Sequence, residues 1–255
     1  MQESLKQDLE SLTCEGNVAK LPTSPLNNYP ALKKTLTKAN GKYNKNTFVF
    51  PNEAQEVVDT LLGGTVVNFK KEFQFFATPI DVIAKMLSHL KEGVMVHRIL
   101  EPSAGHGDLI DHTLLRHPES GVVAVELSEL NTSVLIEKYS PSPKDIFIIK
   151  DDFLKVDPAE LGQFDLVIAN PPFTKNQDID HIMKMYGLVA PGGQLITIAS
   201  KSWTFGSQKK QVAFREFVEE NASVQEELGA GAFKESGTNV STMLLVFNKK
   251  TGAKN

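Results

Sequence analysis

The chain has 255 residues, of which 41% are hydrophobic and 23% charged, and it contains one cysteine. These values are typical of a globular protein with a sizeable core, and the single cysteine excludes a disulfide framework and a Cys-based metal cluster within one chain. No run approaches the roughly 18 apolar residues of a membrane span, and the acidic start of the sequence does not resemble a signal peptide. We therefore expect a cytoplasmic protein with no membrane partner.

The net charge of −4 is not typical of a non-specific nucleic-acid binder, but it hides an asymmetry. Between Gly16 and Asn52 there is no Asp or Glu, and there are six lysines: Lys20, Lys33, Lys34, Lys38, Lys42 and Lys45. A positive strip of this kind is compatible with docking an anionic polymer, with Lys33 and Lys34 as candidate contacts. A solvated, partly disordered arm is the alternative interpretation.

Residues 1–70 are predicted to form an N-terminal extension that contacts DNA or a second subunit. Helices are expected over residues 2–12, 31–39 and 52–62. The remainder of residues 21–52 is rich in Pro, Asn, Thr and Lys, which predicts loops or extended chain.

Residues 71–255 are predicted to form one α/β domain. It begins with a helix, since Thr78 offers an N-cap hydroxyl before Pro79 and apolar residues then recur at helical spacing. From Arg98 onward, short apolar runs alternate with helical stretches, which predicts a parallel sheet covered on both faces. The expected strands are residues 98–100, 122–125, 146–149, 164–169 and 194–199, followed by an antiparallel finish over 224–228 and 242–247. Ligands of such sheets bind at the carboxyl ends of the strands, near the switch in strand order.

The segment Glu101–Leu109 (EPSAGHGDL) follows the first of these strands. Gly105 and Gly107 allow a sharp turn and a close approach of a ligand to the backbone, although a purely structural turn uses the same glycines. A dinucleotide fingerprint needs a third small residue where Ile110 stands. The Glu101 carboxylate instead favours a cationic group, such as the amino acid end of S-adenosylmethionine.

Acidic residues also mark the ends of the next two strands. Glu126 stands about twenty residues further on, where a carboxylate accepts both hydroxyls of a ribose. Asp152 can accept a hydrogen bond from an adenine amine, and Phe153 can cover the adenine ring. Taken alone, these three are ordinary residues of a strand end or a loop, which is the alternative interpretation.

The most informative motif is Asn170-Pro171-Pro172-Phe173, at the end of the strand predicted over residues 164–169. The two prolines stiffen the turn and remove backbone donors, so carbonyl oxygens are left to accept. The Asn170 amide oxygen and the Pro171 carbonyl can together bind an exocyclic amine, and Phe173 can stack on a heterocycle. These groups would orient a nitrogen lone pair toward an electrophilic methyl group.

Taken together, Glu101–Leu109 and Asn170–Phe173 resemble the class I S-adenosylmethionine-dependent methyltransferases that act on amino nitrogens of bases. Residues 75–79 (FFATP) resemble the segment that precedes the cofactor loop in N6-adenine DNA methyltransferases, and residues 233–238 (FKESGT) resemble a phrase that recurs in small enzymes of phages and mobile elements. The resemblance covers roughly residues 70–250. It implies a Rossmann-like α/β sheet of seven strands, mostly parallel with an antiparallel C-terminal strand.

The resemblance implies S-adenosyl-L-methionine as cofactor and the N6 amine of adenine in DNA as acceptor, reached by flipping the base out of the duplex. The residues expected to contact the cofactor are Phe76, Thr78, Glu101, Ser103, Gly105, Gly107, Glu126, Leu127, Asp152 and Phe153. The residues expected to hold the target base and its amine are Asn170, Pro171, Pro172 and Phe173. This chemistry needs no metal ion and no covalent nucleophile.

The chain departs from the family pattern because it has no room for a target-recognition domain. Only 82 residues follow Phe173, and most of them belong to the predicted sheet. Contacts to DNA must then come from residues 1–70, from loops or from a second subunit, so a homodimer is compatible with the sequence.

The best loop for contacting DNA is residues 201–211 (KSWTFGSQKKQ), which follow the fifth strand. The side chains suited to stacking on bases or contacting phosphate are Trp203, Phe205, Lys209 and Lys210. Packing of the two aromatic rings under the sheet edge is the alternative interpretation.

Several alternatives to adenine methylation stay open. The proline turn also suits N4 of cytosine, guanine N2 or adenine N6 in RNA, and a protein glutamine amide. Methylation of cytosine at C5 is excluded, because it needs a Cys nucleophile in a Pro-Cys turn and Cys14 stands between Thr13 and Glu15. The six histidines form no HExxH or comparable metal pattern. A chain that binds without turnover, to counter host defence, is a further alternative.

Overall fold

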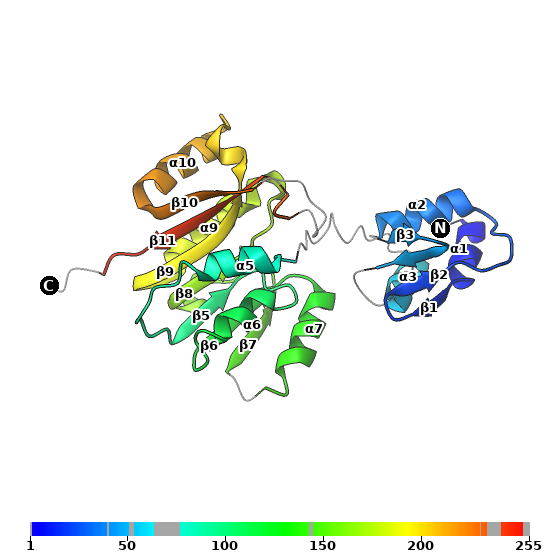
Figure 1. Cartoon of the computed structure of the whole chain (residues 1–255), viewed down its shortest axis with the longest axis horizontal. Helices are drawn as coiled ribbons and strands as arrows, with labels where there is room; N and C mark the ends of the chain where they lie inside the picture. Colours follow the sequence, from blue (N-terminus) through cyan, green and yellow to red (C-terminus); the bar gives the residue numbers. More distant parts are fainter. Residues whose placement is uncertain are drawn as a thin grey trace. The chain divides into compact units, whose positions relative to one another are not determined.

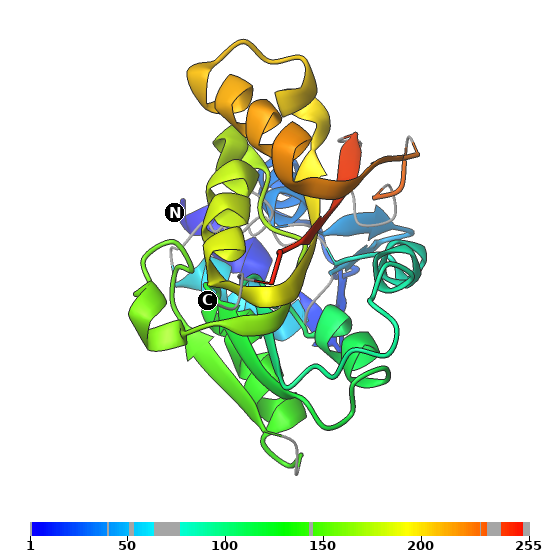
Figure 2. The same cartoon turned by 90° about the vertical axis from the view of Figure 1, so that its left-hand side faces the viewer.

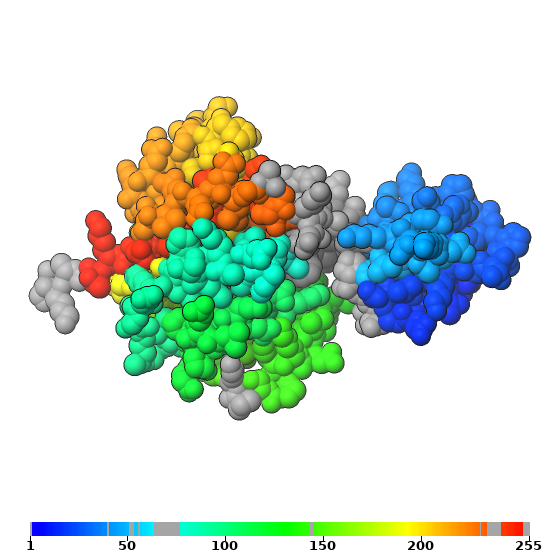
Figure 3. All heavy atoms as spheres, in the orientation of Figure 1, coloured from blue at the N-terminus to red at the C-terminus, as the bar shows by residue number. Residues whose placement is uncertain are grey.

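The computed structural model describes residues 2–39, 41–50, 54–63, 77–142, 145–229, 231–233 and 241–251. The chain divides into two units, Met1–Phe75 and Phe76–Asn255, which can be followed by label in Figure 1 and by colour in Figure 3. No helix in the described ranges is long and apolar enough to cross a bilayer.

The N-terminal unit is a small α/β fold with an antiparallel sheet. Its elements in chain order are α1 (Glu3–Glu10), β1 (Thr13–Glu15), β2 (Val18–Lys20), α2 (Tyr29–Lys38), β3 (Lys42–Asn44), β4 (Thr47–Val49) and α3 (Ala54–Leu62). The strands lie in the order β1-β2-β4-β3, so β1 and β3 are its two edges. In the turn between β3 and β4, Lys45 and Asn46 have φ of 38° and 70°, and two such residues in succession suit a tight hairpin.

The helices of this unit were predictable and its strands were not. The helices expected over residues 2–12, 31–39 and 52–62 are confirmed as α1, α2 and α3. The prediction of loops or extended chain for the rest of residues 21–52 did not include the pairing of β3 and β4 into a hairpin. The described residues of this unit are folded and do not form a disordered arm. Strands of three residues are too short to display the apolar–polar alternation by which a strand is recognised.

A single apolar core joins the sheet of this unit to its helices. Ala19 and Phe48 are paired across β2 and β4, and both are fully buried. They belong to one cluster with Leu32 and Leu36 of α2 and with residues of α1 and α3. Burying each large apolar side chain contributes about 1.5–3 kcal/mol relative to leaving it exposed. The other face of the sheet carries no fully buried side chain, and Lys42 is exposed there.

The larger unit is a doubly wound α/β fold. Its helices and strands in chain order are α5 (Ile80–Leu87), β5 (Arg98–Glu101), α6 (Asp108–Leu114), β6 (Gly121–Glu126), α7 (Glu129–Tyr139), β7 (Ile146–Lys150), α8 (Pro158–Leu161), β8 (Phe164–Ala169), α9 (Gln177–Leu188), β9 (Val189–Ser200), α10 (Lys209–Asn221), β10 (Ala222–Leu228) and β11 (Thr242–Asn248). Two short 3-10 helices, η1 (Thr174–Asn176) and η2 (Lys201–Thr204), follow β8 and β9.

The seven strands lie in the order β10-β11-β9-β8-β5-β6-β7. Neighbours from β9 to β7 are parallel, and β11 runs antiparallel to both β9 and β10. This confirms the predicted seven-stranded, mostly parallel sheet with an antiparallel C-terminal strand. β9 begins five residues earlier than expected, because Val189 already pairs with Phe164 of β8. The register of this pairing then shifts before Gln194 pairs with Leu166, and Gly192 in the intervening segment has φ of 84°.

Two apolar layers cover the two faces of the sheet. Successive side chains of a strand point to opposite faces, so Ile168 of β8 joins the layer under α5, α6 and α7, while Val167 joins the layer under α9 and α10. In Figure 2, α9 (yellow-green) and α10 (orange) lie on one side of the sheet, away from α5 (cyan). The chain passes from β5 outward to β7 and then returns to β8, so the switch in strand order lies between β5 and β8.

Candidate active site

The polar motifs predicted to bind ligand all stand at the carboxyl ends of strands. Glu101 ends β5, Glu126 ends β6, and the Asn170–Phe173 turn follows β8. β5 pairs in parallel with both β6 and β8, so these three residues leave neighbouring strands at the same edge of the sheet. This edge is at the switch point, where doubly wound sheets bind their ligands.

The loop after β5 turns sharply, as its glycines predict. Gly105 and Gly107 have φ of 55° and 82°, in the left-handed region that costs a glycine nothing. The loop is tied back to β6, since the Ala104 N–H donates to the Val125 carbonyl at 3.0 Å and the Gly105 N–H donates to the Glu126 carboxylate at 2.8 Å. The start of α6 is thereby fixed against the end of β6.

Gly107 is also confined by Tyr139 of α7. The Tyr139 hydroxyl donates to the Gly107 carbonyl at 3.1 Å and lies 2.8 Å from Asp111 Oδ1. A Cβ on Gly107 would lie 2.3 Å from the Tyr139 hydroxyl oxygen. The position therefore excludes a side chain both by its backbone conformation and by its neighbour.

We expect Gly107→Ala to reduce the free energy of unfolding by about 2–4 kcal/mol, from left-handed strain and overpacking together. Urea denaturation measures this value. Gly93→Ala is the matched control, because Gly93 has φ of 68° but nothing within 4 Å of an added Cβ, so it should lose only about 1–2 kcal/mol. Equal losses in the two variants would show that Tyr139 does not confine the loop.

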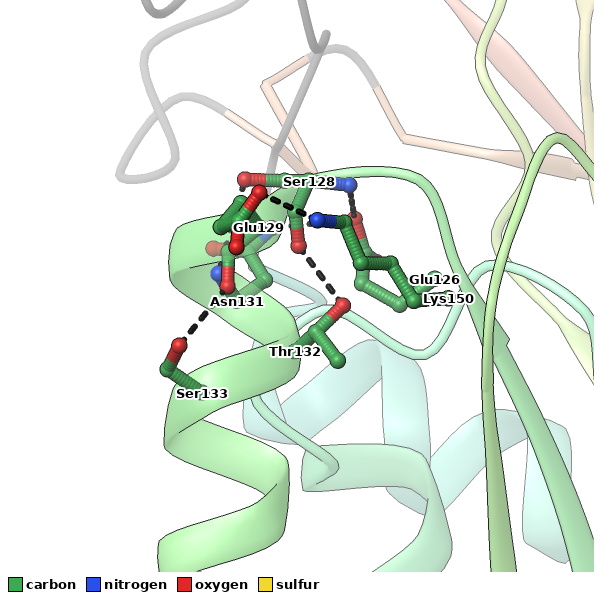
Figure 4. Close-up of polar contacts among 7 residues, drawn as sticks. All are labelled: Glu126, Ser128, Glu129, Asn131, Thr132, Ser133 and Lys150. Carbon is green, nitrogen blue, oxygen red and sulfur yellow. Dashed lines mark hydrogen bonds and ion pairs between the residues drawn. The ribbon is translucent and has the colours of Figure 1, made fainter.

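The Glu126 carboxylate lies at the N-terminus of α7 and is 8% exposed (Figure 4). It accepts hydrogen bonds from the backbone N–H groups of Ser128 at 2.7 Å and Gly105 at 2.8 Å, and from the Asn131 amide at 3.3 Å. Burial raises the pKa of Glu126, and these hydrogen bonds counter the rise. A carboxylate has about four acceptor sites, so Glu126 retains capacity for a ligand.

The Glu101 carboxyl group is more deeply buried, with 1% of the residue exposed. Neither oxygen forms a good hydrogen bond with a residue that the structure describes. Burial and the neighbouring Glu126 raise the pKa of Glu101 well above its usual value, and the backbone N–H of Ser103 lowers it only in part. A buried carboxyl group without compensation is costly, and a cation or N–H donor brought by a ligand would relieve that cost.

The proline turn after β8 is held from two sides. Pro171 is buried, and the Phe173 ring packs edge-on against Phe233, with ring centroids 6.4 Å apart. The Asn170 Nδ2 donates to the Thr78 Oγ1 at 3.2 Å. The amide oxygen of Asn170 is thereby oriented away from Thr78.

The prediction that Thr78 caps α5 is wrong. The helix begins at Ile80, and its N-cap is Pro79, which makes no side-chain cap bond. The Thr78 hydroxyl is used by Asn170 instead, 92 residues further along the chain. A tertiary contact has taken the place of the local one that the sequence suggested.

The residues after Phe173 anchor the turn to the loop after β9. Lys175 and Asn176 have φ of 56° and 59°, which is a strained conformation for residues with a Cβ. The Asn176 side chain accepts from the Ser202 hydroxyl at 3.1 Å, and buried Asp178 accepts from the Ser200 N–H at 2.7 Å. Sequence reasoning missed this network, although Asn is the non-glycine residue that best tolerates the left-handed region.

Asp152 and Phe153 follow β7, and their side chains lie in different surroundings. Asp152 is partly exposed, and its carboxylate accepts from the Leu154 N–H at 3.0 Å. The Phe153 ring is 2% exposed and lies beside His181, with the Lys184 ammonium 4.9 Å from its centroid. The Phe153 ring belongs to the core beneath α9, and its contact with an adenine ring stays a prediction.

The loop over residues 201–211 contributes differently from what was predicted. Trp203 is 2% exposed and packs edge-on against Phe214, with ring centroids 5.2 Å apart, which favours the alternative interpretation that its ring packs under the sheet edge. Phe205 is 76% exposed, and Lys209 is exposed at the start of α10. Lys210 forms an ion pair with Asp180 of α9.

The remaining predicted residues fall in several places. Ser103 lies in the glycine loop, Pro172 is half-buried in the proline turn, and Leu127 is 52% exposed directly after Glu126. Lys33 and Lys34 are exposed on α2 of the N-terminal unit. Phe76 lies outside the described residues. The described part of the chain contains no group of three or more His, Cys, Asp or Glu arranged to hold a metal ion.

Comparison with known proteins agrees with this architecture. No protein-family model matches the chain. The modification methylase CviBIII of Paramecium bursaria Chlorella virus NC1A is 31% identical over 112 residues, which are 43% of this chain and 28% of that protein. The chain therefore matches little more than a quarter of that relative's length.

Two solved structures share the arrangement of strands and helices. One is described as a class I S-adenosylmethionine-dependent methyltransferase of Listeria monocytogenes, with a TM-score of 0.55 at 14% identity over 79% of this chain and 68% of that one. The other is described as an RNA methyltransferase of Pyrococcus horikoshii, with a TM-score of 0.53 at 17% identity over 71% of this chain and 88% of that one. The larger unit has the fold of the class I S-adenosylmethionine-dependent methyltransferases.

Proposed function

We propose that this chain transfers a methyl group from S-adenosylmethionine to the N6 amine of adenine in DNA. The observation that carries the proposal is the position of the Asn170–Phe173 turn beside the glycine loop, at the switch point of a methyltransferase fold. The relative named a modification methylase supports DNA as the substrate.

The carboxyl groups at the strand ends fit the polar groups of the cofactor. Glu101 would hold the methionine amino group, whose positive charge compensates the buried carboxylate. Glu126 would accept the ribose hydroxyls at its remaining acceptor sites, and Asp152 would accept from the adenine amine. When bound, S-adenosylmethionine supplies a methyl group made electrophilic by its sulfonium.

The proline turn fits the acceptor amine. The Asn170 amide oxygen and the Pro171 carbonyl would accept hydrogen bonds from the two amine protons, and Phe173 would stack on the base. The amine nitrogen gains positive charge as the new C–N bond forms, so these hydrogen bonds strengthen in the transition state. One amine proton then leaves to water. The base has to leave the duplex to reach these residues.

Transfer of a tritiated methyl group to three acceptors tests the proposal. The chain is incubated with labelled S-adenosylmethionine and with genomic DNA, total RNA or denatured protein, and the label in each acceptor is counted. We expect label in DNA that is released by DNase. Label in RNA or in glutamine side chains, with none in DNA, would replace DNA by one of the alternative acceptors.

Thr78 is expected to act as a positioning residue for Asn170. In Thr78→Val the Asn170 amide loses its hydrogen bond to the Thr78 hydroxyl, so kcat should fall about tenfold, equivalent to about 1.4 kcal/mol for one hydrogen bond. The Kd for cofactor should change less than threefold, and Thr78→Ser should restore kcat. A large rise in the cofactor Kd with kcat unchanged would instead make Thr78 a cofactor contact.

A further inference from the structure

The N-terminal unit carries five of its seven described lysines on α2, β3 and the turn after β3. The acids of α1, β1 and α3 with described side chains are Glu3, Asp8, Glu10, Glu15 and Asp59. Five lysines of α2, β3 and the turn after β3 form what is here named the basic edge: Lys33, Lys34, Lys38, Lys42 and Lys45. β1 and β3 are opposite edges of a four-stranded sheet, about 14 Å apart at the usual strand spacing. α3 packs against β1 and β2, and α1 packs against both α2 and α3.

The basic edge is exposed, and none of its five lysines forms an ion pair with a residue that the structure describes. All five lysines are exposed. The ion pairs of this unit lie elsewhere, between Lys6 and Glu10 at 3.9 Å and between Lys20 and Glu15 at 2.8 Å. Lysines gathered in this way repel one another, and an anionic partner removes that repulsion.

Three of these lysines, Lys33, Lys42 and Lys45, lie beside the outer strand β3, on it or in the turn that follows it. The Lys33 ammonium lies 5.0 Å from the centroid of the Tyr43 ring, which places α2 beside β3, and Tyr43 is 46% exposed. Successive side chains of a strand point to opposite faces of the sheet, so Lys42 lies on the face opposite to Tyr43. Lys45 lies in the turn between β3 and β4. Protection of a strand edge from aggregation explains a lysine on β3, but it does not explain the three on α2.

We propose that the basic edge docks the phosphate backbone of duplex DNA. This inference rests on the proposed function, which makes DNA the substrate. Flexible, exposed ammonium groups suit contacts to a row of phosphates and carry no means of reading bases. The basic edge therefore contributes affinity and salt dependence, and it contributes no sequence preference.

Fluorescence anisotropy of the full chain with a labelled 20-base-pair DNA duplex, without cofactor, tests this inference. The test variant is Lys34→Gln/Lys45→Gln, and the matched control is Lys6→Gln/Lys20→Gln in the same unit, with the same change of charge. We expect the Kd for DNA to rise at least fivefold in the first and less than twofold in the second. The slope of log K against log salt should fall by about 1–2 in the test variant only.

Two results would overturn the docking surface: equal affinities of the two variants, or tenfold tighter binding of duplex RNA of the same sequence. Failure of the docking surface and failure of the proposed function give different results. If the test variant loses DNA affinity while the wild type methylates no DNA, the docking surface stands and the proposed function fails. If the wild type methylates DNA while both variants bind alike, the proposed function stands and the docking surface fails.

Discussion

Replacing Asn170 with Ala is expected to reduce kcat for methyl transfer at least 100-fold while leaving the Kd for S-adenosylmethionine within about threefold. The hydrogen bond that the amide oxygen accepts strengthens as positive charge develops on the amine. Removing one preorganised group that stabilises transition-state charge reduces kcat about 100–1,000-fold. The side chain lies on the turn after β8, whereas the carboxyl groups expected to hold the cofactor end β5 and β6. Single-turnover kinetics and calorimetric titration measure the two quantities.

A control for this variant is Asn221→Ala, the same change at the end of α10, where the amide contacts Tyr186 and the Phe217 carbonyl. This variant should retain at least half of wild-type kcat. An Asn170→Ala protein with more than a tenth of wild-type kcat would contradict the role given to the amide. A loss of cofactor affinity equal to the loss of kcat would place Asn170 in the cofactor site instead.

Glu101→Gln is expected to stabilise the cofactor-free protein at neutral pH and to weaken cofactor binding. The pKa of Glu101 is raised well above its usual value, chiefly by burial. Between the unfolded pKa and the folded one, the folded chain holds a proton that the unfolded chain has released. The free energy of unfolding of the wild type therefore falls as pH rises from the unfolded pKa to the folded pKa of Glu101. In the glutamine variant this decrease is absent, because the side chain does not titrate.

The difference in unfolding free energy between Glu101→Gln and wild type should be small near pH 4 and reach about 1–3 kcal/mol above the folded pKa. Urea denaturation over this pH range measures it. The cofactor Kd should rise at least tenfold, because the methionine amino group loses its counter-charge. Glu219→Gln, an exposed position of α10, should change neither quantity. A Glu101→Gln protein with wild-type stability at every pH and wild-type cofactor affinity would remove Glu101 from the site.

The central strands of the larger sheet, β5 to β8, were predictable because each contains a short apolar run near turn residues. β8 begins and ends at the predicted residues, β5 and β7 each end one residue later than predicted, and β6 is one residue longer at both ends. The glycine loop was predictable as a turn, since Gly105 and Gly107 both adopt a conformation that other residues avoid. Once the strands are known, the placement of the motifs follows from the topology of doubly wound sheets.

Aromatic side chains were the least predictable part of the site. Phe153 and Trp203 stand next to motif residues in the sequence, and a ring that covers a ligand has the same sequence pattern as a ring that packs in the core. Their burial depends on α9 and α10, which are distant in the sequence. The contact between Thr78 and Asn170 was hidden for the same reason, because it joins segments that meet only in the folded chain.

The most direct test of methyl transfer to adenine N6 is nucleoside mass spectrometry after reaction with S-adenosylmethionine that carries a trideuterated methyl group. Unmethylated DNA is incubated with the wild type or with Asn170→Ala, digested to nucleosides and separated. With the wild type, the account predicts N6-methyldeoxyadenosine that is three mass units heavier than N6-methyldeoxyadenosine with an ordinary methyl group. With Asn170→Ala, the rate of formation of this product should be at least 100-fold lower. The label on cytosine, or equal label with both proteins, would contradict it.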